Sequence, residues 1–105
     1  MKYPQTPDGR YFIVKGRLWR CTNPHLDELT RARWVKQLMN ARRQVKQAKQ
    51  KENEEALSFA RAQVDEAKVA LGERGPVWWT DNAPDYNRYM AKNTPYADWY
   101  ASLKL

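Results

Sequence analysis

Cys21 and His25 are the two side chains of this chain whose spacing could form a nucleophile and its base. Four residues apart on a helix, a thiol and an imidazole would share one face. Pro24 stands between them, at an expected transition from strand to helix, so a shared face is not expected. The pattern favours a half-buried strand cysteine and a solvated histidine over a catalytic pair.

Metal and phosphate chemistry have little support in the composition. His25 is the only histidine and Cys21 the only cysteine, so a zinc site would need two ligands from carboxylates or another chain. The four glycines form no loop that could cradle a phosphate. Glu73, Asp81 and Asp85 could line a cleft, yet each also fits a role in a turn or a first helical turn. The sequence therefore predicts no catalytic residue, no metal and no cofactor.

Length and composition predict one domain, spanning residues 1–105. The chain is 42% hydrophobic and 12% aromatic, which is typical of a globular protein and argues against disorder. A single cysteine excludes an intramolecular disulfide and fits a reducing compartment. No apolar run approaches the roughly 20 residues that span a bilayer. We expect a cytoplasmic protein with no membrane partner.

An alanine-rich middle with apolar residues at heptad spacing predicts a long antiparallel helical hairpin, of coiled-coil type, at about 24–71. Asn23 with Pro24 is expected to begin its first helix, and Gly72 to end its second. The two apolar seams are offset by 19 residues, which is not a multiple of seven, so a reversal near Asn53 is expected. One continuous helix stays open as an alternative and would almost require a partner chain. The seams comprise Trp34, Leu38, Ala41, Val45 and Ala48, and then Leu57, Ala60, Val64, Ala67 and Leu71.

Aromatic residues gather at both ends of the chain, where they predict a β-hairpin at about 11–21 and a C-terminal aromatic cap at about 76–103. Because Lys15 suits a two-residue turn poorly, we expect a three-residue loop with Gly16 at its bulge. One ribbon face should lie against the helices, since two strands alone are marginally stable. The fold class is thus mainly α (α+β). Two short helices in the cap are indicated by Asn82 with Asp85 and by Thr94 with Pro95.

Four strings, at 6–12, 16–20, 70–79 and 84–88, give the chain a family resemblance. The more specific parts are Gly-Pro-Val-Trp-Trp and Pro-Asp-Tyr-Asn-Arg. Over nearly its whole length the chain resembles a family of small uncharacterised bacterial proteins, sometimes loosely labelled as related to biphenyl-2,3-diol 1,2-dioxygenase III. The resemblance implies no established activity. Extradiol oxygenases hold iron with two histidines and a carboxylate, and His25 alone cannot build that site, so dioxygenase activity is not expected.

Cations without acids occupy the stretch 31–51, the strongest charge bias in a chain with a net charge of +7. At 100° per residue, several of them fall on one flank of the first seam. They could follow a phosphate backbone or an acidic groove of a protein, and the ordinary alternative is a solvated helix face. The basic surface predicted here consists of Arg31, Arg42, Arg43, Lys46 and Lys49.

Neighbouring tryptophans in an extended segment should point to opposite sides, so either the cap covers both or one is left as a hot spot. These features favour a non-enzymatic cytoplasmic interaction or scaffold protein that binds an unknown protein partner or associates with itself through its helical arm. One alternative is a nucleic-acid-binding module that uses the basic first helix. A second is a small enzyme with a pocket near Trp78, Trp79 and Asp85. The binding residues predicted in this segment are Trp78, Trp79, Asp85, Tyr86, Asn87 and Arg88.

Overall fold

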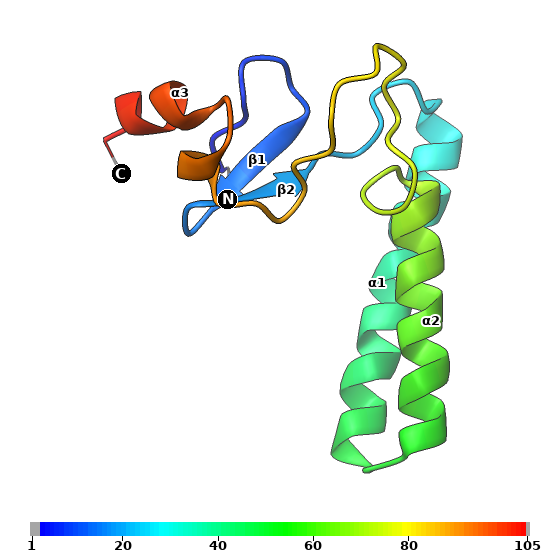
Figure 1. The fold of residues 1–105 in the computed structure, drawn as a ribbon. Coiled ribbons are helices and arrows are strands. Elements are labelled where there is room, and N and C mark those ends of the chain that lie inside the picture. The colour runs from blue at the N-terminus through cyan, green and yellow to red at the C-terminus, as the bar shows by residue number, and fades with distance from the viewer. Residues whose placement is uncertain (1–2, 105) are drawn as a thin grey trace. The chain divides into compact units, whose positions relative to one another are not determined.

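The computed structural model describes residues 3–104, which form a β-hairpin, two long helices and two short C-terminal helices (Figure 1). They divide into two compact units, an aromatic unit of residues 3–21 and 77–104 and a helical unit of residues 22–76. The predicted α+β fold is confirmed. Within residues 3–104, no helix combines the length and the apolarity needed to cross a membrane. The elements are β1 (Tyr11–Val14), β2 (Arg17–Arg20), α1 (Glu28–Gln50), α2 (Glu54–Ala70), η1 (Ala91–Asn93) and α3 (Ala97–Ser102).

Helix α1 begins later than the sequence predicted. The carboxylate of Asp27 accepts a hydrogen bond from the Thr30 N–H at 2.7 Å and so caps the helix. The side chain of Asn23 instead accepts from the His25 N–H at 2.9 Å. The prediction of Asn23 as the cap was wrong because its side chain closes a separate turn, which leaves the helix start to Asp27.

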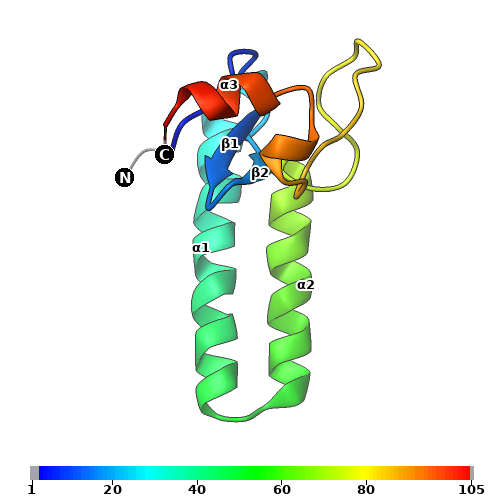
Figure 2. The same ribbon diagram turned by 60° about the vertical axis from the view of Figure 1, so that its left-hand side comes forward.

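The reversal between α1 and α2 is confirmed, and Figure 2 shows the two helices side by side with a short turn at their far end. Asn53 caps α2 as predicted, accepting from the Ala56 N–H at 3.0 Å. Glu52 adopts a left-handed φ of 51°. Its N–H reaches the Lys49 carbonyl at 3.2 Å, while the Asn53 N–H reaches the Ala48 carbonyl at 3.0 Å. This is a Schellman motif in which a glutamate takes the place usually held by glycine.

The end of α2 uses the same motif with the expected glycine. Gly72 has a φ of 83°, and its N–H donates to the Val69 carbonyl at 3.0 Å. The next N–H, of Glu73, donates to the Lys68 carbonyl at 2.9 Å. These two bonds satisfy carbonyls that a helix end leaves open. The prediction of Gly72 as the terminating residue is confirmed.

The two predicted seams form the interface between α1 and α2. Leu38 packs with Ala67 and Leu71, and Trp34 and Val64 lie half-buried against them. Four of the buried interface residues are alanines. Their small side chains let the two backbones approach closely. The buried seam residues are Leu38, Ala41, Ala48, Ala60, Ala67 and Leu71.

The β-hairpin turns through two residues rather than three. In the antiparallel register Val14 pairs with Arg17, and Lys15 and Gly16 between them have φ angles of 52° and 79°. Two left-handed residues define a type I′ turn, so the three-residue prediction was wrong. The turn is held by its surroundings, since the Gly16 carbonyl accepts from the Ala91 N–H at 2.9 Å. Lysine is therefore accommodated in a conformation that it would not favour alone.

Backbone covers both edges of the ribbon. Along β1, the Ile13 N–H donates to the Pro4 carbonyl at 2.9 Å. Along β2, the Leu18 N–H donates to the Tyr89 carbonyl at 2.9 Å, and the Arg88 N–H donates to the Leu18 carbonyl at 2.7 Å. An uncovered edge would be open to pairing with other chains. Here the neighbouring segments occupy those groups.

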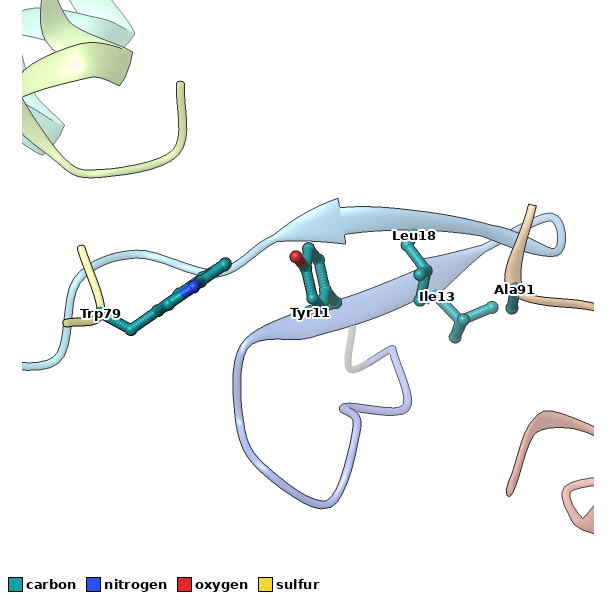
Figure 3. Packing of buried hydrophobic residues seen from close by; sticks show 5 residues of the cluster. All are labelled: Tyr11, Ile13, Leu18, Trp79 and Ala91. Carbon is teal, nitrogen blue, oxygen red and sulfur yellow. The ribbon is translucent and has the colours of Figure 1, made fainter. Parts of the chain in front are cut away.

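One face of the ribbon forms the core of the aromatic unit (Figure 3). Tyr11, Ile13 and Leu18 are buried there against Trp79 and Ala91. The Tyr11 ring meets the Trp79 ring edge-on, with centroids 5.7 Å apart. The ribbon therefore packs on the C-terminal segment of its own unit, where the sequence had predicted helices as its partners.

The first predicted helix of the cap does not form. The stretch 86–90 consists of a turn followed by an isolated bridge to Arg17. Its backbone makes one turn hydrogen bond of its own, from the Tyr89 N–H to the Tyr86 carbonyl, and otherwise pairs with β2. Asn82 has a φ of 65° and caps no helix. The second predicted helix forms as α3, which begins at Ala97, close to the expected start at Thr94 and Pro95. The Thr94 hydroxyl accepts from the Tyr96 N–H at 3.2 Å.

Candidate functional site

Trp78 and Trp79 serve the core of the aromatic unit. The Trp79 indole N–H donates to the Ala83 carbonyl at 2.9 Å, and the Trp78 indole N–H donates to the Cys21 carbonyl at 3.1 Å. Trp79 is buried and Trp78 half-buried. Their rings touch edge-on, with centroids 5.1 Å apart. The prediction that they point to opposite sides was wrong, because both rings turn to the same aromatic cluster.

Asp85 and Asn87, predicted as binding residues, hold the turn that covers β2. Asp85 accepts from the Asn87 N–H at 2.9 Å, and Asn87 accepts from the Arg20 N–H at 2.9 Å. A carboxylate oxygen of Asp85 also lies 3.5 Å from the guanidinium of Arg20, whose side chain is 1% exposed. A guanidinium at this depth needs a nearby counter-charge. Asp85 supplies this counter-charge, while its own side chain is 41% exposed.

The Tyr11 hydroxyl lies at the centre of this turn. It accepts from the Tyr86 N–H at 2.8 Å and lies 3.5 Å from the Pro84 carbonyl and from Asp85. Burial raises the pKa of Tyr11 to about 12. A phenol with so high a pKa stays protonated at neutral pH and acts as a fixed hydrogen-bonding group.

A second polar cluster, which was not among the predicted sites, secures the loop before β1. Asp8 accepts from the Tyr96 hydroxyl at 2.6 Å and from the Thr6 hydroxyl at 2.7 Å. Burial opposes ionisation of Asp8, but these hydrogen bonds outweigh it and lower the pKa of the carboxyl. The partners lie 88 positions apart in the chain, so no local pattern could have indicated the pair.

Arg10 joins the same loop to the C-terminal segment. Its guanidinium forms an ion pair with Asp81 and lies 4.8 Å from the centroid of the Trp79 ring. The hydrogen bond from Arg10 lowers the pKa of Asp81. Asp81, considered above as a catalytic acid, is thus a partner of Arg10.

The predicted basic residues are largely exposed on α1. Arg42, Lys46 and Lys49 are exposed, as is Arg43, which donates to Asn40. Arg31 forms an ion pair with Glu28 one turn earlier. Arg42 and Lys49 lie beside the groove between the helices, where they line two different hollows.

An arginine-lined hollow lies between α1 and α2. Its volume is about 360 Å³, and it is lined by Arg42, Arg61 and Arg74 together with the half-buried Val45 and Val64. We call these five residues the arginine furrow. Arg61 and Arg74 were not among the predicted basic residues. They lie on α2 and just beyond it, whereas the predicted basic surface was confined to the first helix.

The opposite flank of the hairpin has a different character. At 100° per residue, Arg42 and Gln44 lie on opposite sides of the seam residue Ala41. On the Gln44 side, a hollow of about 250 Å³ is lined mainly by amides. We call its lining the amide furrow, which comprises Gln37, Asn40, Ala41, Gln44, Gln63 and Glu66.

The four hollows described in this structure involve other residues than the predicted enzyme pocket. Four hollows lie along the helical hairpin, and none of these four is lined by Trp78, Trp79 or Asp85. Among residues 3–104, no three or more histidines, cysteines or acids gather in a group that could hold a metal ion.

No family model matches the chain, and neither does any curated protein or solved structure.

Proposed function

We propose that this protein is a non-enzymatic interaction protein whose helical hairpin docks an acidic, amphipathic helix of a partner protein. The observation that carries the proposal is the arginine furrow, in which two valines and three arginines line one hollow. Grooves between packed helices commonly accept a third helix, whose apolar face covers the floor. The furrow supplies both an apolar floor and a charged rim.

The charges favour an acidic partner. Arg42 and Arg61 are exposed on the furrow, while Arg74 forms an ion pair with Asp65 at 3.1 Å. Carboxylates that flank the apolar face of a docked helix would meet these guanidiniums, which are suited to bidentate contacts. Phosphates alone would leave Val45 and Val64 facing water, so the apolar floor favours a protein helix over a nucleic-acid backbone.

Peptide binding tests this function. The probe is a designed helix with leucines on one face flanked by glutamates, and a copy with lysines in place of the glutamates is its control. We expect the acidic peptide to bind the full chain in fluorescence anisotropy and the basic copy not to bind. The double variant Arg42→Glu with Arg61→Glu should weaken binding at least about tenfold, because it reverses two charges at the rim.

A matched variant locates the site. Gln44→Glu with Gln63→Glu changes two residues of the amide furrow and should leave the affinity within about twofold of the wild-type value. Equal binding of the acidic and basic peptides, or equal loss in both double variants, would rule out docking in the arginine furrow.

A further inference from the structure

The ribbon face that points away from the core of the aromatic unit gathers rings and cations. Phe12 and Trp19 are paired across the two strands, and alternation along each strand places them opposite the buried Tyr11 and Leu18. Tyr3 stacks on Phe12, with centroids 6.0 Å apart and planes inclined by 27°. Two stacked rings and the indole of their cross-strand neighbour therefore share this face.

Cations accompany these rings. The guanidinium of Arg88 lies 5.9 Å from the centroid of the Trp19 ring, and Arg88 is exposed. Arg17 is also exposed, two residues from Trp19 on the same side of β2. We call Tyr3, Phe12, Arg17, Trp19 and Arg88 the outer ribbon face.

Acidic residues are absent from the backbone segments that build this sheet. The segments 3–6, 11–20 and 86–93 contain neither aspartate nor glutamate, and of their five cations all but the buried Arg20 are exposed. The nearest carboxylates in the sequence are Asp8 and Asp85. Asp8 accepts hydrogen bonds from Tyr96 and Thr6, and Asp85 accepts one from the Asn87 backbone. Exposed cations, Arg17 and Arg88, beside the exposed Tyr3 and the partly exposed Phe12 and Trp19 are the combination that single-stranded nucleic acid requires, with phosphates on the cations and bases on the rings.

We infer that the outer ribbon face binds single-stranded nucleic acid by base stacking on Tyr3, Phe12 and Trp19, with Arg17 and Arg88 contacting phosphates. Bases in a duplex are already stacked on each other, so this face favours single strands over duplexes of the same sequence. The inference is independent of the proposed docking of a helix, because it depends on different residues in the other unit.

The experiment measures binding of a labelled single strand to the full chain at low salt. The strand has about 15 nucleotides, near the upper end of the site sizes of single-strand-binding domains. We expect binding that weakens steeply as salt is added and that exceeds binding to the matched duplex. Arg17→Glu with Arg88→Glu should weaken binding at least about tenfold, and Trp19→Ala should do so by a similar factor. Circular dichroism checks that each variant is folded, and the arginine variant keeps every ring in case Trp19→Ala does not fold.

Matched controls separate this face from general charge. Arg42→Glu with Arg61→Glu lowers the net charge by the same four units, from +7 to +3, and should retain binding within about threefold. Arg33 lies 5.9 Å from the Trp34 ring centroid in the helical unit, so Arg33→Glu changes an equivalent cation–π pair and should have little effect. Absence of binding at low salt, preference for the duplex, or an equal or greater loss in the Arg42 and Arg61 variant would overturn the inference.

Discussion

The two units of this chain differ in how far apart in the sequence their stabilising contacts lie. In the aromatic unit, Tyr11 bonds to the backbone of Tyr86, 75 positions away. In the helical unit, α1 and α2 are separated by three residues and meet through seams of regular spacing. Contacts of the first kind depend on individual polar and aromatic partners, whereas contacts of the second kind depend on a repeated pattern. The units should therefore respond differently to substitution.

Removing a central ring should affect the aromatic unit most. Tyr11 is fully buried, so Tyr11→Ala should lower the free energy of unfolding by about 3–5 kcal/mol. Tyr11→Phe should cost about 1–3 kcal/mol, because the Tyr86 N–H loses its acceptor. Urea unfolding followed by tryptophan fluorescence measures both. Tyr89→Ala, at a residue that is 53% exposed, should change stability by less than about 0.5 kcal/mol, and a similar loss there would contradict the core assignment.

Enlarging a buried alanine should disturb the helical unit. Ala67 is fully buried between the helices, so Ala67→Leu should destabilise by about 1–3 kcal/mol by forcing them apart. The measurement is thermal unfolding followed by the helical circular dichroism signal. Ala62 is exposed on the same helix, and Ala62→Leu is the matched control with an expected change near zero. Equal melting temperatures for the two variants would contradict the view that the seam alanines allow the helices to approach closely.

Extremes of pH should act on the aromatic unit. The folded pKa of Asp8 is lowered, so its contribution is present above the unfolded pKa and is lost as pH falls through the folded value. The folded pKa of Tyr11 is raised to about 12, so its contribution is present below the unfolded pKa of 10.0 and is lost as pH rises toward the folded value.

Stability measured from pH 2 to 12 tests both directions. Tyr96→Phe removes a donor to Asp8 and should flatten the acid limb. Because burial raises the pKa of both tyrosines, Tyr11→Phe and Tyr96→Phe should each flatten part of the alkaline limb. An acid limb unchanged in Tyr96→Phe would show that this hydrogen bond does not set the carboxyl pKa.

Lys15 in the aromatic unit and Glu52 in the helical unit each occupy a strained turn, and relieving the strain should give small gains. Glu52 and Lys15 have positive φ angles that glycine or asparagine adopts more easily. Glu52→Gly and Lys15→Asn should each stabilise by roughly 0.5–1 kcal/mol in chemical denaturation. Glu55→Gly, within the first turn of α2, should instead destabilise by a similar amount. A loss in Glu52→Gly would mean that its side chain makes a stabilising contact at the tip.

The helical unit could be predicted from the sequence because its information is local. Heptad spacing identified the seams from Trp34 to Leu71, Asn53 marked the reversal and Gly72 marked the end. The start of α1 was misplaced because Asn23 and Asp27 are both good caps, and only the turn made by Asn23 decides between them.

The aromatic unit could be predicted only in outline. Residues 86–90 have helical spacing but pair with β2, since an open strand edge offers more hydrogen bonds than an isolated short helix would retain. The roles of Asp8, Arg10 and Asp85 depend on partners far along the chain, and spacing gives no sign of them. Arg61 and Arg74 joined Arg42 only once the helices were paired.

The hydrogen bond from the Trp78 indole to the Cys21 carbonyl, at 3.1 Å, ties together the two points where the chain leaves and re-enters the aromatic unit. Residues 22–76 are thus an insertion in the aromatic unit, and the two ends of this insertion lie close together. Such an arm can be exchanged, lengthened or replaced by a short linker without parting the strands from the C-terminal segment. The aromatic unit could thus accept helical arms of other lengths or sequences at this junction.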